Sequence, residues 1–200
     1  MFIQIIDSIK KKGLIETIVR VILFVLNIVL SKIKVLWLLS RGYNIDFSVN
    51  LGKGSTFSQS TKNSIKIRRN CVIGDYVDIR TGFGGSISID KGVHVYSNTR
   101  IDIHSRLEIG EDSLVAPFCY LTDYNHNFTS NSKPIKDQGY VVKPVVIGKN
   151  VWLGTHVVVL KGVQIGDNCV IGAGSIVTRN IPANSVAVGV PARVIRKRNR

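Results

Sequence analysis

The sequence predicts a mainly β fold, a solenoid in which short parallel strands stack coil upon coil. An apolar helical segment precedes the solenoid and one extended loop interrupts it. Three observations support this prediction: a six-residue repeat, an apolar run near the amino terminus, and a polar stretch in which the repeat is lost. A fixed period of six fits neither the spacing of an amphipathic helix nor the alternation of a half-buried strand. It indicates stacked units that bury one continuous core between neighbours.

The repeat is clearest from Ile147 to Pro182, which divides into six consecutive hexads. The second place is usually Gly. Every first place is aliphatic: Ile147, Leu153, Val159, Ile165, Ile171 and Val177. Every fifth place is small or β-branched: Val151, Val157, Val163, Cys169, Ser175 and Ile181. Each hexad therefore predicts one inward-facing side of a coil, followed by a corner where Gly or Asn allows the chain to bend.

Three hexads close one coil, and parallel stacking pairs the strand backbones above and below. Earlier hexads also arrive in threes, beginning at Ile67, Ile89 and Ile109. Small shifts of register separate them, at Gly84–Ser88 and at Leu107–Glu108. With the six hexads above and a weak first set from about Val49, the sequence predicts five clear coils and one weaker coil. The domain boundaries expected are 1–48 for the helical segment and 49–200 for the solenoid.

The amino-terminal segment does not follow the hexad. Leu14 to Leu39 is strongly apolar and lacks Gly and Pro, which predicts a helix. Its longest charge-free stretch, Val21 to Ser31, is shorter than the ~20 residues that span a bilayer. No small-residue cleavage site follows, so we do not expect a signal peptide. Lysines flank the run at positions 10–12, 32 and 34, which favours an interfacial anchor on an anionic inner leaflet. The alternatives are a helix packed on the solenoid or on a neighbouring subunit, and a membrane span.

The composition limits the partners and the compartment. The net charge of +14 comes from 27 basic and 13 acidic residues and suggests an anionic partner. No basic–aromatic binding module is present, so we expect no nucleic acid. The cysteines Cys71, Cys119 and Cys169 all occupy fifth places, which predicts inward packing and a reducing compartment.

One histidine stands apart from the other three. His94, His104 and His156 fall on outer or corner places of hexads and are expected to be surface or packing residues. His126 ends a hexad where the repeat is lost, at the start of a loop expected over 127–144. Long insertions in a regular solenoid are often functional. A neutral imidazole there would be able to take a proton from a hydroxyl near pH 7. Residues 190–200 are expected to form a basic tail.

Residues 50–197 resemble the hexapeptide-repeat acyltransferases, which fold as a left-handed parallel β-helix. The motifs that carry the resemblance are TDYNHNF and the run from NVWLGTHVVV through GVPARVI. They are similar to the maltose, galactoside and capsule or O-antigen acetyltransferases. The resemblance implies that His126 is the catalytic base and that Asn98 helps to hold the acceptor. The acetyl-CoA site that it implies comprises Trp152, Gly154, Thr155, Ala173, Thr178, Arg179, Arg193 and Arg196.

The implied reaction is direct acetyl transfer from acetyl-CoA to a sugar hydroxyl. Asp123 or a backbone carbonyl would orient the imidazole of His126, and a backbone N–H near Gly154 would stabilise the oxyanion. No Ser or Cys occupies a nucleophile motif, so no acyl-enzyme is expected, and no metal is expected. The family forms homotrimers with each site between two subunits. The apolar segment favours a surface polysaccharide or its lipid-linked precursor as acceptor, with a cytoplasmic enzyme peripheral on the inner membrane face.

Four alternatives stay open at this point. The protein would be an N-acetyltransferase for a nucleotide-linked amino sugar if its acceptor were an amine. A non-catalytic membrane-associated scaffold would keep the repeat without the chemistry. A carbonic anhydrase of the same fold needs several zinc-binding histidines brought together, and the four histidines here form no close pair. A nucleic-acid binder is suggested only by the net charge.

Overall fold

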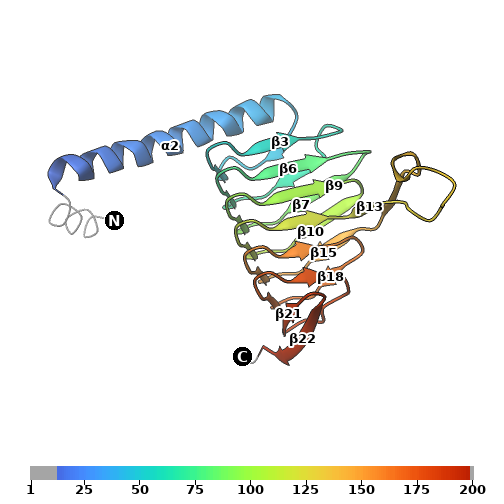
Figure 1. The fold of residues 1–200 in the computed structure, drawn as a ribbon. Coiled ribbons are helices and arrows are strands. Elements are labelled where there is room, and N and C mark those ends of the chain that lie inside the picture. Colours follow the sequence, from blue (N-terminus) through green and yellow to red (C-terminus); the bar gives the residue numbers. More distant parts are fainter. Residues whose placement is uncertain (1–12, 199–200) are drawn as a thin grey trace.

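The structure is a computed structural model that describes residues 13–198, and it is a β-solenoid of six coils with one long helix at its first coil (Figure 1). Each coil contributes one strand to each of three sheets, which we name A, B and C in the order in which the chain visits them. The corners between them are the A–B, B–C and C–A edges. Mainly β architecture in stacked coils was predicted from the hexads and is confirmed.

Sheets A, B and C have the following strands. Sheet A contains β1 (Asn44–Ile45), β4 (Ile65–Ile67), β7 (Ser86–Ile89), β10 (Arg106–Ile109), β15 (Val145–Ile147) and β18 (Gln164–Ile165). Sheet B contains β2 (Asn50–Leu51), β5 (Val72–Ile73), β8 (His94–Val95), β11 (Leu114–Val115), β16 (Trp152–Leu153), β19 (Val170–Ile171), β21 (Ser185–Gly189) and β22 (Ala192–Lys197). Sheet C contains β3 (Thr56–Ser58), β6 (Asp78–Thr81), β9 (Arg100–Ile103), β12 (Tyr120–Thr122), β17 (Val158–Val159) and β20 (Ile176–Val177).

The hexad assigns the core correctly. The first-place residues from Ile147 to Val177 and the fifth-place residues from Val151 to Ile181 are all at most 4% exposed. Cys71, Cys119 and Cys169 are buried free thiols, as their place in the hexad predicted. Burial raises the pKa of Cys71 and of Cys119 to about 11. These thiols are therefore packing residues that remain protonated at neutral pH.

Asparagine at the fourth place of the hexad forms the A–B edge. Asn150, Asn168 and Asn184 have φ values of 52°, 59° and 57°, a conformation that Asn adopts more readily than most residues. Their side chains form a ladder along the edge. Asn150 Nδ2 donates to Asn168 Oδ1 at 2.8 Å, and Asn168 Nδ2 donates to Asn184 Oδ1 at 3.1 Å. The corner residue thus supplies both the bend and a bond to the next coil.

The helix α2 (Leu14–Ser40) caps the first coil with its carboxyl-terminal part and extends beyond the solenoid with the rest (Figure 1). Val35 and Leu38 are buried against the core, and Ser31 Oγ accepts the N–H of Leu51 at 2.8 Å. Lys32 Nζ donates to the carbonyl oxygens of residues 47–49 at 3.0–3.2 Å. These contacts cover the open end of the stack. They agree with the alternative in which the helix packs on the solenoid.

The free part of α2 is apolar over most of its circumference, and its polar residues Glu16, Arg20 and Asn27 share one face. Residues from Leu14 to Leu30 include thirteen large hydrophobic side chains that are 40–79% exposed. By length and composition the helix is able to cross a membrane, with a mean hydropathy of 2.2 over its most apolar window. The flanking lysines at positions 10–12 lie outside the described residues.

Two expectations about loops change. The segment expected as a loop over 127–144 leaves the solenoid at the C–A edge. It belongs to a structured hairpin of β13 (Tyr124–His126) and β14 (Tyr140–Val142), with a 3-10 turn η1 (Ile135–Asp137) near its tip. Gln138 closes the tip, because its Nε2 donates to the carbonyls of Ser130 and Lys133 at 2.8 Å. The basic tail expected over 190–200 was wrong for most of its length. Residues 192–197 form β22, which pairs antiparallel with β21 and covers the last coil.

Candidate active site

The B–C edge places Asn98 in a regular column of corner residues. Each coil turns there through a residue with positive φ: Gly54, Tyr76, Asn98, Phe118, His156 and Gly174. The N–H of Asn98 donates to the carbonyl of Asp75 on the preceding coil at 3.0 Å, and the other members after Gly54 form equivalent bonds. The backbone of Asn98 is therefore fixed, while its side chain is exposed to solvent.

Four residues implied for acetyl-CoA lie on or beside this same edge, two and three coils further along. Trp152 is 51% exposed on the outer face of sheet B, between Leu114 and Val170. Thr155 Oγ1 lies 2.8 Å from the carbonyl of Pro117. Gly154 and Ala173 are adjacent across coils, because a Cβ on Gly154 would lie 2.7 Å from the backbone nitrogen of Ala173. The N–H of Gly154 donates to the carbonyl of Ile171 at 2.8 Å, so it is not available as an oxyanion donor.

The other implied donor residues are distributed elsewhere. Thr178 and Arg179 are exposed on the C–A edge, just after β20. Arg193 and Arg196 lie in β22, opposite Val188 and Val186 of β21. One chain therefore places the eight implied acetyl-CoA residues on two different edges and on the outer strand of sheet B.

Asp123 has a different environment from the one expected for an orienting carboxylate. It is 0% exposed, and its oxygens accept the backbone N–H groups of His104, Ser105 and Arg106 at 2.8, 2.7 and 2.8 Å. Its contacts hold the C–A corner of the preceding coil in place. Among the hydrogen bonds of residues 13–198, none joins Asp123 to His126.

His126 lies at the root of the hairpin, where the chain leaves the solenoid. It is the last residue of β13 and stands opposite Tyr140 of β14. The imidazole is exposed, and its ring centroid lies 4.7 Å from that of Tyr140 at an interplanar angle of 42°. A side chain on a paired strand is held in place more precisely than one on an open loop. Because the imidazole is exposed, a hydroxyl group of a substrate is able to reach it.

An aromatic cluster that the sequence analysis did not identify surrounds this position. His104 stacks on Tyr124 with centroids 3.6 Å apart and an interplanar angle of 2°. The His104 ring also meets Phe83 edge-on at 4.7 Å and Tyr140 edge-on at 5.0 Å. These rings come from two successive coils, which supply Phe83 and His104, and from the hairpin, which supplies Tyr124 and Tyr140. The signal that would have pointed to Phe83 is its place among glycines in TGFGGS, at a break in the hexad.

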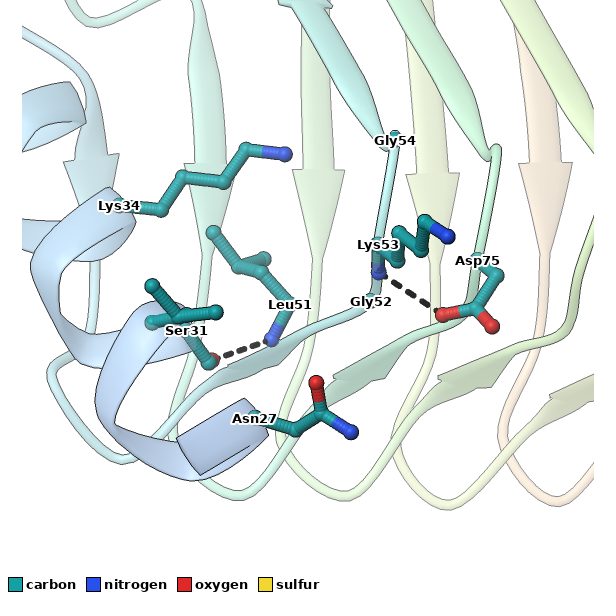
Figure 2. A pocket seen from close by; sticks show the side chains of 9 residues that line it. Asn27, Ser31, Lys34, Leu51, Gly52, Lys53, Gly54 and Asp75 are labelled. Atoms are coloured by element: carbon teal, nitrogen blue, oxygen red, sulfur yellow. Dashed lines mark hydrogen bonds between the residues drawn. The ribbon is translucent and has the colours of Figure 1, made fainter. Parts of the chain in front are cut away.

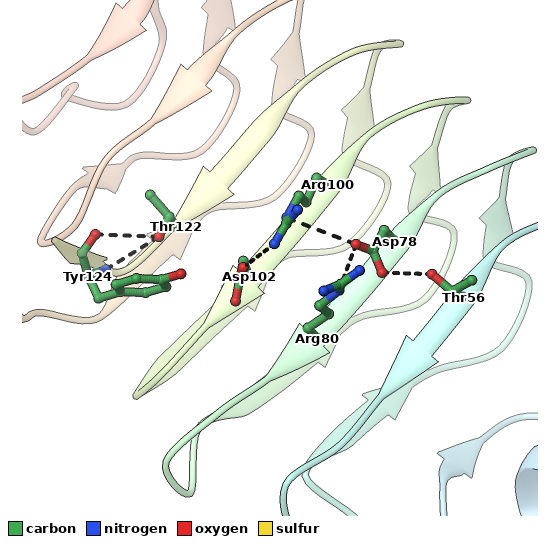
Figure 3. A network of polar contacts seen from close by, with 7 residues as sticks. All are labelled: Thr56, Asp78, Arg80, Arg100, Asp102, Thr122 and Tyr124. Carbon is green, nitrogen blue, oxygen red and sulfur yellow. Dashed lines mark hydrogen bonds and ion pairs between the residues drawn. The ribbon is translucent and has the colours of Figure 1, made fainter. Parts of the chain in front are cut away.

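A charged network on the outer face of sheet C leads to the same cluster (Figure 3). Arg100 donates to Asp102 at 2.7 Å and lies 3.9 Å from Asp78, which pairs with Arg80 at 2.7 Å. Burial and the negative charge of Asp102 raise the pKa of Tyr124 to about 12. The Tyr124 phenol therefore stays neutral across the physiological range.

Sheet C separates the two sets of predicted residues within one chain. Asn98, Gly154, Thr155 and Ala173 lie on or beside the B–C edge, whereas His126 and Arg179 lie on the C–A edge. Strand β9, which runs from one edge to the other, has four residues and a length of about 13 Å. The structure thus brings Asn98 and the Trp152 region onto one side, and places His126 across a sheet from them.

A groove of about 510 Å³ lies between α2 and the first two coils (Figure 2). Leu30 contributes an apolar wall, and Lys34, Lys53 and Asp75 contribute charge. Lys34 donates to Ser55 Oγ at 2.7 Å, and burial lowers its pKa. Asp75 accepts the N–H of Lys53 at 2.8 Å. The groove reaches the B–C edge one coil before Asn98. Over residues 13–198, no group of three or more His, Cys, Asp or Glu side chains is arranged to hold a metal ion.

Comparison with known proteins gives consistent matches. Residues 144–179 match the family described as bacterial transferase hexapeptide (six repeats). A probable acetyltransferase of Mycobacterium tuberculosis, Rv3034c, is 39% identical over 151 residues, which cover 75% of this chain and 50% of that protein. The galactoside O-acetyltransferase of Escherichia coli is 44% identical over 117 residues, 58% of this chain and 57% of that protein. A putative lipopolysaccharide biosynthesis O-acetyl transferase of the same species, WbbJ, is 36% identical over 126 residues, 58% of this chain and 60% of that protein. The chain therefore spans half to three fifths of the length of these relatives.

Solved structures share the fold. AntD, an N-acyltransferase from Bacillus cereus in complex with dTDP and 3-hydroxybutyryl-CoA, superposes with a TM-score of 0.68 at 21% identity, covering 82% of this chain and 87% of that one. VCA0836, a hexapeptide-repeat acetyltransferase from Vibrio cholerae complexed with acetyl-CoA, gives 0.57 at 23% identity, covering 74% and 73%. At these identities the likeness concerns the fold alone.

Proposed function

Because the chain belongs to the hexapeptide-repeat acetyltransferase family, we propose that it transfers an acetyl group from acetyl-CoA to a sugar hydroxyl. The acceptor we propose is a surface polysaccharide or its lipid-linked precursor. The observation that carries the proposal is the placement of His126. Its exposed imidazole is held on a paired strand exactly where a structured hairpin leaves the solenoid.

In the proposed reaction, His126 takes the proton of the acceptor hydroxyl as the oxygen attacks the thioester carbonyl. The C–S bond breaks as the tetrahedral intermediate collapses, and the imidazolium returns the proton to the coenzyme A thiolate. An ester and a free thiol are the products, so the step balances without an acyl-enzyme. The exposed Arg193 and Arg196 guanidinium groups would bind coenzyme A phosphates. Each donates one hydrogen bond to a neighbouring carbonyl and has further N–H groups to offer a phosphate.

We propose that the working site forms between copies of this chain, in a homotrimer. Sheet C separates His126 from Asn98 and Trp152 within one chain, so one copy would supply the base and a neighbour would supply the other residues. Closed cyclic symmetry repeats that arrangement at every interface. This proposal predicts that His126→Ala and Asn98→Ala, each inactive alone, restore part of the activity when refolded together. A mixture that stays inactive while forming mixed trimers would contradict it.

We further propose that α2 attaches the enzyme to the inner face of the cell membrane. Its free part exposes a broad apolar surface, and burying that surface in lipid is strongly favourable. The groove between α2 and the solenoid lies beside this membrane contact and opens toward the B–C edge (Figure 2). A lipid-linked acceptor held at the bilayer would therefore reach the edge that carries Asn98.

Vesicle flotation tests the membrane contact. The full chain should float with phosphatidylglycerol vesicles, and Leu23→Glu with Phe24→Glu should abolish flotation. Substitution of the equally exposed Phe128, on the hairpin, by Glu is the matched control and should float as the wild type does. Flotation of the helix variant would show that the protein contacts lipid through a surface other than α2. Failure of the wild type to float would refute the proposed membrane attachment.

The central test measures thiol release from acetyl-CoA with polymeric glycans, lipid-linked glycans and a nucleotide-linked amino sugar as acceptors. We expect turnover with a hydroxyl acceptor and a loss of about 10²-fold or more in His126→Ala, with the fold retained. His94→Ala is the control, because His94 lies in sheet B, away from the hairpin. If turnover in His126→Ala equals that of the wild type, His126 is not the general base. Exclusive turnover of the amino sugar would establish N-acylation instead.

A further inference from the structure

We propose that Phe83 and Tyr140 form a platform on which a pyranose ring of the acceptor stacks beside His126. The inference rests on the proposed function and deepens it, since it assigns the residues that recognise the sugar. It starts from two exposed rings: Tyr140, which contacts His126, and Phe83, which contacts Tyr140. Phe83 is 77% exposed and Tyr140 is 41% exposed.

The spacing of the rings matches a sugar. The Tyr140 centroid lies 4.7 Å from that of His126 and 5.5 Å from that of Phe83. A pyranose ring with its substituents is about as wide as these separations, and it presents a face of C–H groups that packs on aromatic rings. The two rings are inclined to each other by 50°, so a sugar stacked on Tyr140 would meet Phe83 along its edge. In that position it would direct a ring hydroxyl toward the imidazole. The neighbouring hydroxyls would remain in water.

Phe83 has a left-handed backbone conformation that is unfavourable for a residue with a side chain. It has φ 49° in the turn Gly82–Gly85, where glycine supplies the other residues of the bend. A left-handed conformation costs an L-residue about 1–2 kcal/mol, and the exposure of Phe83 recovers little by burial. Elsewhere on the C–A edge the positive-φ corners use smaller residues, as at Asn63 and Gly162. On the B–C edge, Tyr76 and Phe118 are also exposed aromatic residues at positive-φ corners. The feature that points to a ligand contact at Phe83 is therefore its place in the ring cluster with His104 and Tyr140.

The platform is braced from below, so that the rings are fixed before a ligand arrives. His104 contacts both rings edge-on, and it is itself stacked flat on Tyr124. A Cβ on Gly82 would lie 2.9 Å from the His104 ring, so this glycine is what lets the imidazole pack under the turn. Tyr140 is fixed separately by its pairing with His126 in the hairpin. A prearranged surface loses less conformational entropy on binding than a mobile one.

The test compares Phe83→Ala, Tyr140→Ala and Tyr140→Phe in the full chain. Phe128→Ala is the matched control, because Phe128 is 69% exposed on the same hairpin and makes none of the ring contacts of the cluster. Two readouts are needed. The first is binding of methyl β-D-galactopyranoside, methyl α-D-glucopyranoside and maltotriose at up to ~50 mM, followed by saturation-transfer NMR. The second is steady-state acetyl transfer, with KM measured separately for acceptor and for acetyl-CoA.

We expect each alanine variant to weaken sugar binding and to raise the acceptor KM by about tenfold, as the loss of one stacking contact implies. The acetyl-CoA KM should be unchanged, and Tyr140→Phe and Phe128→Ala should resemble the wild type. Sugar binding that depends on Phe83 without any acetyl transfer would support the platform and refute the proposed function.

Four results would overturn the platform. The first is transfer with acceptor KM values unchanged in both alanine variants. The second is a change confined to the acetyl-CoA KM, which would place the rings in the donor site. The third is dissociation of the oligomer in Phe83→Ala, which would make the ring a subunit contact. The last is no binding of any of the three sugars by the wild type.

Discussion

Replacement of Asp123 separates a structural role from a chemical one. The carboxylate is fully buried and accepts three backbone N–H groups at 2.7–2.8 Å. Asp123→Ala would leave those donors without a partner at the corner that precedes the hairpin. We therefore expect this substitution to act mainly on stability, although Asp123 lies three residues from His126.

The magnitude follows from the number of bonds. A hydrogen bond to a charged group contributes about 1.5–3 kcal/mol, and an unsatisfied buried donor costs about 1–3 kcal/mol. The three donors share one acceptor group, and water would reach some of them once the side chain is removed, so the terms do not simply add. We expect the free energy of unfolding to fall by about 3–5 kcal/mol. For a chain of this size, that lowers Tm by about 10 °C.

The assay is thermal unfolding followed by circular dichroism, together with acetyl transfer at a temperature where the variant is folded. Asp167→Ala is the matched control, because the exposed Asp167 accepts only the N–H of Lys149 and should cost under about 1 kcal/mol. We expect Asp123→Ala to keep kcat within a few-fold of wild type. An unchanged Tm with kcat reduced 10²-fold would refute this reasoning and give Asp123 the orienting role.

The remaining predictions concern the core thiols and the glycine turn. The pKa values of Cys71 and Cys119 are raised by burial to about 11, so their stabilising contribution is complete below pH 9 and lost as the pH rises toward 11. Between pH 9 and pH 11, the free energy of unfolding of the wild type should fall by up to about 2–3 kcal/mol per thiol. The double variant Cys71→Val with Cys119→Val should lack this decrease when both are followed by urea unfolding. Parallel pH profiles of the two proteins would contradict the prediction. Gly82→Ala should displace the His104 ring and raise the acceptor KM several-fold, because its Cβ would lie 2.9 Å from that ring. Gly84→Ala, where the new Cβ meets nothing within 4 Å but φ is +81°, should cost about 1 kcal/mol of stability and leave the acceptor KM unchanged.

The repeat made the fold predictable because each hexad place has one physical task. The first and fifth places face the core, so their burial could be assigned residue by residue, including the three cysteines. The fourth place bends the chain, which explains the asparagine ladder on the A–B edge. The end of the solenoid was less predictable. Val194 and Ile195 follow no hexad, and their strand depends on pairing with β21 across a turn.

The candidate site was predictable only in part, because closeness in sequence does not determine which hydrogen-bond partner a polar group has in the fold. Asp123 was expected to face His126 because it is close in sequence. In the structure its carboxylate points instead to the corner of the preceding coil, 17–19 residues earlier in the chain. The sequence likewise predicts an oxyanion donor among the backbone N–H groups near Gly154, but the N–H of Gly154 itself donates to Ile171 of the next coil. His126 and Asn98 remain predictions that activity measurements must test.

The insertions that interrupt the repeat indicate where a site could form, which the regular hexads do not. A regular coil advances eighteen residues, as between Ile147 and Ile165. The first four coils are longer, and every insertion falls on the C–A edge: residues 59–64, 82–85, 104–105 and the hairpin. The regular strands have no freedom to position a catalytic group, because their outward places recur identically on every coil. Lengthened corners on one edge break that equivalence. They bring Phe83 and His104 into contact and, through Tyr140, join His126 to the same cluster of rings. In a solenoid of this kind, the edge on which consecutive insertions coincide is therefore where the sequence itself directs the search for a site.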